Sequence, residues 1–140
     1  MITCPKHTIW GAVQGHGTAL GRHEVRARVD RPGWDKYAEG WDVRTAGHGG
    51  IVLCDEAHKK IPAYFRAVAE YGVPERQYEE DCNIALVVLV FPDWFRCKEL
   101  NYGENQIQMA HTMIARRWPD LYARFMGADA PKPQQMEIGA

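Results

Sequence analysis

Residues 41–54 read WDVRTAGHGGIVLC, and this stretch predicts a β-hairpin. In its first part the apolar residues alternate with Asp42 and Arg44, which is the period of two of a half-buried strand. Its last part, Gly50–Cys54, is a short run rich in residues that favour strands. Between them, the glycine-rich segment Ala46–Gly50 is typical of a hairpin turn. We therefore expect an antiparallel pair of strands in the N-terminal half of the chain.

Two segments upstream of this hairpin predict further strands. Arg22–Val29 alternates apolar and charged side chains, so we expect a half-buried strand with a charged outer face. His7–Val13 is predicted to supply another strand. Together with the hairpin, these segments predict a small antiparallel sheet.

The second half of the chain changes to a helical period. Apolar residues spaced three and four apart predict a buried stripe along one helix, namely Ile107, Ala110, Ile114 and Trp118. The unbroken apolar run Cys82–Phe91 fits either a strand or a buried helix, and the carboxylates just before it favour a helix because they suit its N-terminus. The predicted helices are Pro62–Tyr71, Cys82–Phe91, Glu104–Trp118 and Asp120–Met126.

These elements predict an α+β fold. The antiparallel sheet from the N-terminal half should pack on one face against helices from the C-terminal half. Residues 1–127 are expected to form a single globular domain, and residues 128–140 a flexible tail containing proline and glutamine.

Composition excludes several classes of protein. The chain has 140 residues, 46% of them hydrophobic, which suits one folded domain. Lysine and arginine total 17 against 18 acidic residues, so a strongly acidic DNA mimic and a basic protein held by phosphates are both disfavoured.

Cysteine spacing and hydropathy suggest a cytoplasmic protein. The cysteines are far apart and fit no zinc-finger or thioredoxin-type pattern, so we expect reduced thiols and neither a metal nor another cofactor. The N-terminus has no signal-peptide pattern. The longest apolar run, Ile84–Phe91, is far too short to span a membrane, and no membrane association is expected.

The first candidate site is the predicted turn around His48. Gly47, Gly49 and Gly50 could leave backbone N–H groups free to hold an anion, and the histidine could act as an acid, a base or a ligand. The simpler alternative is that the glycines adopt positive φ in a hairpin while the histidine packs locally.

The second candidate site is the acidic run Glu79, Glu80 and Asp81. These carboxylates could include a general base or could bind a divalent cation, whereas the simpler alternative is that they cap the helix that follows. We expect His48 to meet one of them. A nucleophilic Cys82 assisted by His48 and Asp81 is a weaker alternative.

The third candidate site is an arginine face. Arg22, Arg26 and Arg28 lie on one side of a predicted strand, where they could bind phosphates or an acidic protein surface. A solvated outer face is the simpler alternative.

Several motifs occur in an order that resembles a known family. They are YAEG at 37–40, VRTAGHGGI at 43–51, Ile61-Pro62, YEEDC at 78–82, Phe91-Pro92 and WPDLY at 118–122. Over residues 10–126 the chain resembles an uncharacterised domain-of-unknown-function family found in plasmids, prophages and phages. It departs from that pattern at Asn83-Ile84, where an aromatic residue often follows the acidic motif. The resemblance implies a mobile genetic element and no particular activity.

Three functions fit these observations. The first is a phage-type accessory protein that binds and inhibits a host defence component, such as a CRISPR effector or a restriction system. The second is a small hydrolase or nucleotide-processing enzyme that uses His48 with Glu79, Glu80 or Asp81. The third is a nucleic-acid-binding accessory protein that uses the arginine face.

Overall fold

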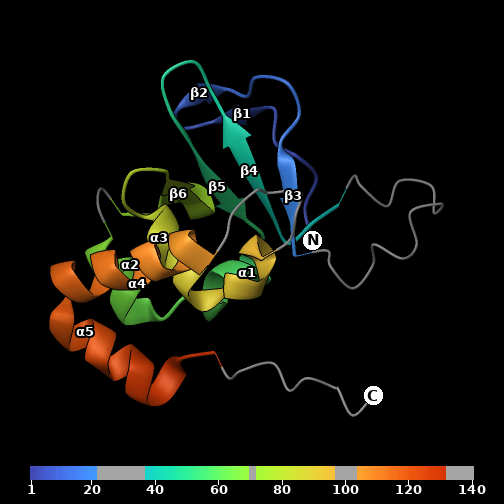
Figure 1. Ribbon diagram of the computed structural model, residues 1–140. Helices are drawn as coiled ribbons and strands as arrows, with labels where there is room; N and C mark the ends of the chain where they lie inside the picture. The colour runs from blue at the N-terminus through green and yellow to red at the C-terminus, as the bar shows by residue number, and fades with distance from the viewer. Residues whose placement is uncertain (22–36, 70–71, 97–103, 132–140) are drawn as a thin grey trace, which may run out of the picture.

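A four-stranded antiparallel sheet forms the centre of the computed structural model, which describes residues 1–21, 37–69, 72–96 and 104–131 (Figure 1). Its strands, in spatial order, are β3 (Thr18–Leu20), β4 (Gly40–Arg44), β5 (Gly49–Leu53) and β6 (Gln77–Glu79). The predicted hairpin is confirmed as β4 and β5, whose register pairs Arg44 with Gly49.

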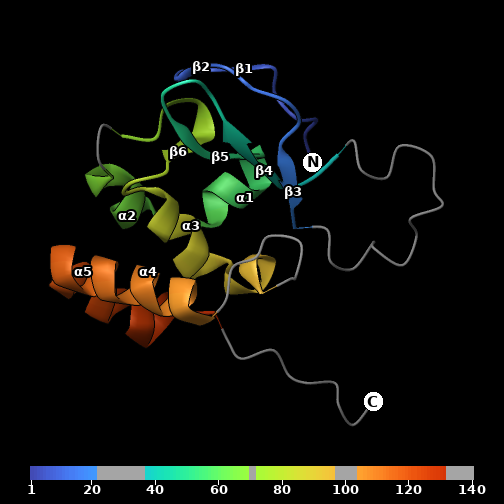
Figure 2. The ribbon, with the colours of Figure 1, turned by 45° about the horizontal axis from the view of Figure 1, so that its top comes forward.

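The N-terminal segment differs from the prediction. It forms a two-stranded hairpin, β1 (His7–Thr8) with β2 (Gly11–Ala12), because the chain reverses after Thr8 and Gly11 adopts a φ of 122°. This hairpin lies against the sheet on the side away from the helices (Figure 2). The strand predicted at Arg22–Val29 lies outside the described residues.

In the part of the chain that the structure describes, five α-helices follow the strands or connect them. They are α1 (Asp55–Lys60), α2 (Ala63–Val68), α3 (Ile84–Val90), α4 (Glu104–Arg117) and α5 (Pro119–Arg124). Short 3-10 helices occupy Pro74–Arg76 and Pro92–Phe95. The buried apolar run is therefore a helix, α3, as predicted. Helix α1 was not predicted; at its start, the Cys54 Sγ accepts a hydrogen bond from the Ala57 N–H at 3.5 Å.

The C-terminal region corrects two predictions. A π-helical turn, Phe125–Asp129, continues α5 beyond Met126, the predicted end of this helix. Trp118 lies at the junction of α4 and α5, where it is only partly buried, because Pro119 starts a new helix there. The rest of the predicted stripe of α4 is buried as expected: Ile107, Ala110 and Ile114.

The core has two layers, one on each face of the sheet. Ile51 and Leu53 of β5 face the larger layer, which the helices cover. Val52 alternates to the opposite face and packs with Trp41 and Val43 beneath the N-terminal segment. Figure 2 shows this order from the β1–β2 hairpin through the sheet to α3 and then α4. No helix in the described ranges is long and apolar enough to cross a membrane.

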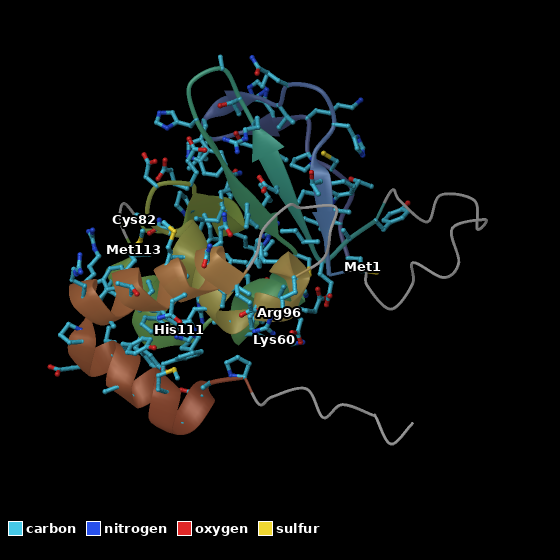
Figure 3. All side chains as sticks on the ribbon, in the orientation of Figure 1. Met1, Lys60, Cys82, Arg96, His111 and Met113 are labelled. Carbon is cyan, nitrogen blue, oxygen red and sulfur yellow. The ribbon has the colours of Figure 1, made fainter. Side chains whose placement is uncertain are left out.

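Two histidines join this core through tyrosine hydroxyls. The Nδ1 of His58 lies 2.8 Å from the Tyr78 hydroxyl, and the Nδ1 of His111 lies 2.7 Å from the Tyr122 hydroxyl on α5. Figure 3 labels His111 on α4. Burial lowers the pKa of both histidines from the ordinary value of 6.5.

The lowered pKa values of these two histidines predict a loss of stability in mild acid. The unfolded chain takes up protons near pH 6.5, whereas the folded chain resists them, so the free energy of unfolding should fall as the pH drops through that value. Urea unfolding at about pH 7.5 and about pH 5.5 measures the difference. The double variant His58→Asn, His111→Asn should show a smaller difference, and an equal difference in both proteins would contradict the assignment.

Candidate functional site

The structure brings the His48 turn and the acidic run together. The Nδ1 of His48 lies 3.6 Å from the Oε1 of Glu79, although about thirty residues separate them in sequence. That distance is within the range of an ion pair and longer than a hydrogen bond. Glu80 forms a different pair, because its Oε2 accepts a hydrogen bond from the Arg44 Nη1 at 2.8 Å. Asp81 is exposed.

Strand register explains why these segments meet. In the pairing of β5 with β6, Gly50 lies opposite Glu79, and the Glu80 N–H donates to the Gly49 carbonyl at 2.9 Å. The residue that precedes β5 is His48, so the turn necessarily ends beside the end of β6. The Oε2 of Glu79 accepts the Asp81 N–H at 2.9 Å, which orients the carboxylate.

This placement corrects the expectation that the carboxylates cap a helix. Glu79 ends β6, and Glu80 and Asp81 form the turn that follows it, so the first turn of α3 contains no acidic residue. Backbone pairing with β5 holds the acidic run at the edge of the sheet and thereby keeps it out of the helix.

The glycines of the turn also differ from the prediction. Gly49 and Gly50 belong to β5 and have no positive φ, because the strand ladder holds them in extended conformation. A Cβ at Gly50 would lie 2.3 Å from the Tyr78 carbonyl oxygen and 2.5 Å from the Trp10 ring. Close approach of the backbone therefore explains this glycine, whereas a Cβ at Gly47 would meet nothing within 4 Å.

The turn closes through hydrogen bonds between Thr45 and His48. The His48 N–H donates to the Thr45 Oγ1 at 3.2 Å, and the Thr45 N–H donates to the His48 carbonyl at 2.7 Å. These bonds engage the His48 N–H, and the anion site around Gly47, Gly49 and Gly50 stays a prediction. The turn also offers the imidazole to a ligand.

The environments of the two paired side chains are unequal. The His48 side chain is 55% exposed and can meet a ligand, whereas the Glu79 side chain is 21% exposed. The Oε1 of Glu79 is sealed from solvent and has no hydrogen-bond partner among the described residues. A sealed carboxylate oxygen facing an accessible imidazole is suited to orienting that ring.

A cleft of about 750 Å³ opens beside this pair. Gln77 holds one wall in place, because its Oε1 accepts the Ile9 N–H at 2.8 Å and so ties the β1–β2 hairpin to β6. The volume lies within the range of pockets for small ligands. The residues of the cleft that bear chemistry are Trp10, His48, Glu79, Asp81, Cys82 and Arg117.

Sequence reasoning missed two of these residues. Trp10 comes from the N-terminal hairpin and Arg117 from the end of α4, and neither belongs to a motif or a charge pattern that points to the cleft. Cys82 lies in the same cleft, on the segment before α3 (Figure 3). Only the tertiary fold brings these residues to one place.

Two sets of side chains could bind other groups. Glu79, Glu80 and Asp81 each offer an oxygen atom within 4.8 Å of the others, a spacing that a hard cation such as Mg²⁺ or Ca²⁺ could bridge. The arginine face of Arg22, Arg26 and Arg28 lies outside the described residues and stays a prediction.

Comparison with known proteins gives one match. A family model described as "Domain of unknown function (DUF7007)" matches residues 32–138, a span that contains both the His48 turn and the acidic run. No curated protein and no solved structure matches the chain.

Proposed function

Because the chain belongs to the DUF7007 family, whose description gives no activity, we propose its function from the cleft: a small hydrolase in which His48 is the general base and Glu79 orients it. The observation that carries this proposal is the 3.6 Å approach of the Glu79 carboxylate to the Nδ1 of an accessible imidazole. Contacts of this kind are often long in an empty site and shorten when substrate binds.

The chemistry follows from the tautomer that this geometry favours. A carboxylate facing Nδ1 stabilises the proton on that nitrogen and leaves the lone pair of Nε2 free to act as a base. The Nε2 of His48 accepts a proton from water, the hydroxide attacks the electrophilic centre of the substrate, and the leaving group takes the proton back from Nε2. Glu79 stabilises the imidazolium between the two transfers.

Cleft size and lining define the substrate class. The volume suits a molecule about as large as a nucleotide, and Trp10 supplies an aromatic surface beside the acid–base pair. Arg117 offers a cationic end for an anionic group. Hydrolysis of a small aromatic ester or phosphate ester, including a nucleotide, therefore fits the cleft best.

The test is turnover of a substrate panel by matched variants. The panel contains nitrophenyl acetate, nitrophenyl phosphate mono- and diesters, and nucleoside phosphates. We expect the wild-type protein to turn over at least one of them. His48→Ala should then lose about 100-fold or more in kcat/KM, because general-base catalysis typically contributes that much.

Two further variants complete the test. Glu79→Gln should also lose kcat/KM. His7→Ala is the control, because His7 is an exposed histidine on β1, and its kcat/KM should change little. All variants should keep their melting temperature, since His7 and His48 are exposed and glutamine at position 79 has the size of glutamate and an oxygen that can accept the Asp81 N–H. Absence of turnover by the wild-type protein on the whole panel would count against the hydrolase, and so would full activity of His48→Ala.

A second function is favoured by a different surface. Met109 and Met113 of α4 are 63% and 38% exposed, and exposed methionines are common on surfaces that bind other proteins. We infer from them a protein-binding role, which agrees with the idea of an accessory protein that inhibits a host defence component. The phage setting of this idea is what the family resemblance implies.

A further inference from the structure

The methionines of α4 border a second groove, which shares Asp81 with the cleft beside the His48 pair. The groove has a volume of about 330 Å³ and lies between α4 and α3 with the turn that precedes α3. One side of it is formed by Asp81, Ile84, Ala85 and Val88, and the other by Gln106, Met109, Ala110 and Met113. Figure 3 shows Met113 on α4 near the start of α3.

Each side of this groove contains a stripe of one helix. On α3 the lining residues 84, 85 and 88 lie on one stripe of the helix, with Asp81 in the turn just before it, and on α4 residues 106, 109, 110 and 113 form a second stripe. Two such stripes form the kind of groove into which the side chains of a third helix pack. A stripe of seven residues is about 10 Å long, which matches about two turns of a docked helix.

The groove is apolar along its length and acidic at one rim. Asp42, Glu80 and Asp81 line it, and the one cation among its described lining residues is Arg44, which pairs with Glu80. The described part of the rim is therefore net negative. A partner that places a lysine or arginine beside its apolar residues would complement that charge.

We propose that this groove binds an amphipathic helix of a partner protein, with apolar residues spaced three and four apart and a basic side chain next to them. The proposal rests on the protein-binding role inferred above and names the chemistry of the partner. The apolar residues of the partner pack against Met109 and Met113, whose flexible side chains adapt to them. The basic side chain reaches the carboxylates of Glu80 and Asp81.

The experiment is a titration followed through methionine methyl resonances. The probes are two synthetic amphipathic peptides of about 14 residues, long enough to form helix, with leucines at identical positions and either lysine or glutamate on the polar face. The lysine peptide should shift the methyl signals of Met109 and Met113 saturably, with an affinity about tenfold or more above that of the glutamate peptide. Met126, which is also exposed but lies away from the groove, is the internal control.

Substitutions at Asp81 and Met113 test the groove directly. Asp81→Asn should weaken binding of the lysine peptide several-fold, and Met113→Glu should abolish it. Equal binding of both peptides, or no saturable shift at Met109 and Met113, would overturn the proposal. Shifts at Met109 that depend only on protein concentration would show a second copy in the groove and would also overturn it. Capture of one stoichiometric host protein that Met109→Glu loses, without binding of the lysine peptide, would leave the protein-binding role intact and reject this partner.

Discussion

Ile114→Asp should leave the domain largely unfolded. Ile114 is completely buried in the core on the helix side of the sheet, where α4 packs against α3. An aspartate there would be a charge without a partner in an apolar site, and we expect a loss of at least about 4 kcal/mol in the free energy of unfolding. Since small domains are stable by only about 5–15 kcal/mol, circular dichroism and urea unfolding should both report the loss.

The control for this variant lies two residues away on the same helix. Thr112 is exposed, so Thr112→Asp introduces the same charge into α4 without burying it. We expect its free energy of unfolding to stay within about 0.5 kcal/mol of the wild type. A folded Ile114→Asp protein with a melting temperature near that of Thr112→Asp would refute the assignment of α4 to the core.

Gly50→Ala should destabilise the protein by about 3 kcal/mol, a large effect for one methyl group. The added Cβ would lie 2.3 Å from the Tyr78 carbonyl oxygen, which is backbone and pairs within the sheet, and 2.5 Å from the Trp10 ring. Either β5 and β6 separate or the N-terminal hairpin moves, and both changes cost packing. Thermal and urea unfolding measure the loss.

Gly47→Ala is the matched control for this prediction. Gly47 lies in the same turn region, has no positive φ and would place its Cβ in open space. The same substitution should therefore leave the stability unchanged or raise it by up to about 1 kcal/mol, because alanine restricts the unfolded chain. Equal losses at the two positions would mean that close approach at Gly50 does not explain the glycine.

The sequence predicted those elements whose periodicity is strong. Alternation around Asp42 and Arg44 identified β4, and the three-and-four spacing of apolar residues identified α4. The helix α3 was predicted correctly for a reason that the structure does not support, because the carboxylates before it belong to a strand end and a turn. Burial of its apolar run on nearly all sides is what makes it a helix of the core.

Short elements escaped prediction because tertiary contacts stabilise them. The three residues of β6 carry no periodic signal and form a strand only by pairing with β5. The hairpin of β1 and β2 is too short for its alternation to differ from that of a single strand. Helix α1 is only six residues long, and apart from Ala57 it buries little that a pattern could reveal.

The candidate site was predictable in its chemistry and not in its surroundings. Histidine among glycines and three adjacent carboxylates stand out in the sequence, and the strand register then explains why His48 meets Glu79. The positions of Trp10 and Arg117 depend on how the N-terminal hairpin and α4 pack, which no local pattern encodes. The need for glycine at position 50 could not be predicted either, because the crowding there comes from Tyr78 and Trp10, which the fold brings close.

The tautomer of His48 tests the central claim most directly, because it reports the contact with Glu79 without any substrate. Long-range ¹H–¹⁵N NMR spectra of the neutral imidazole distinguish a proton on Nδ1 from one on Nε2. We predict the Nδ1–H form in the wild-type protein, with Nε2 unprotonated, and a change to the Nε2–H form in Glu79→Ala while the signals of His111 stay unchanged. A wild-type His48 that carries its proton on Nε2, or a tautomer that does not respond to Glu79→Ala, would contradict the proposed acid–base pair.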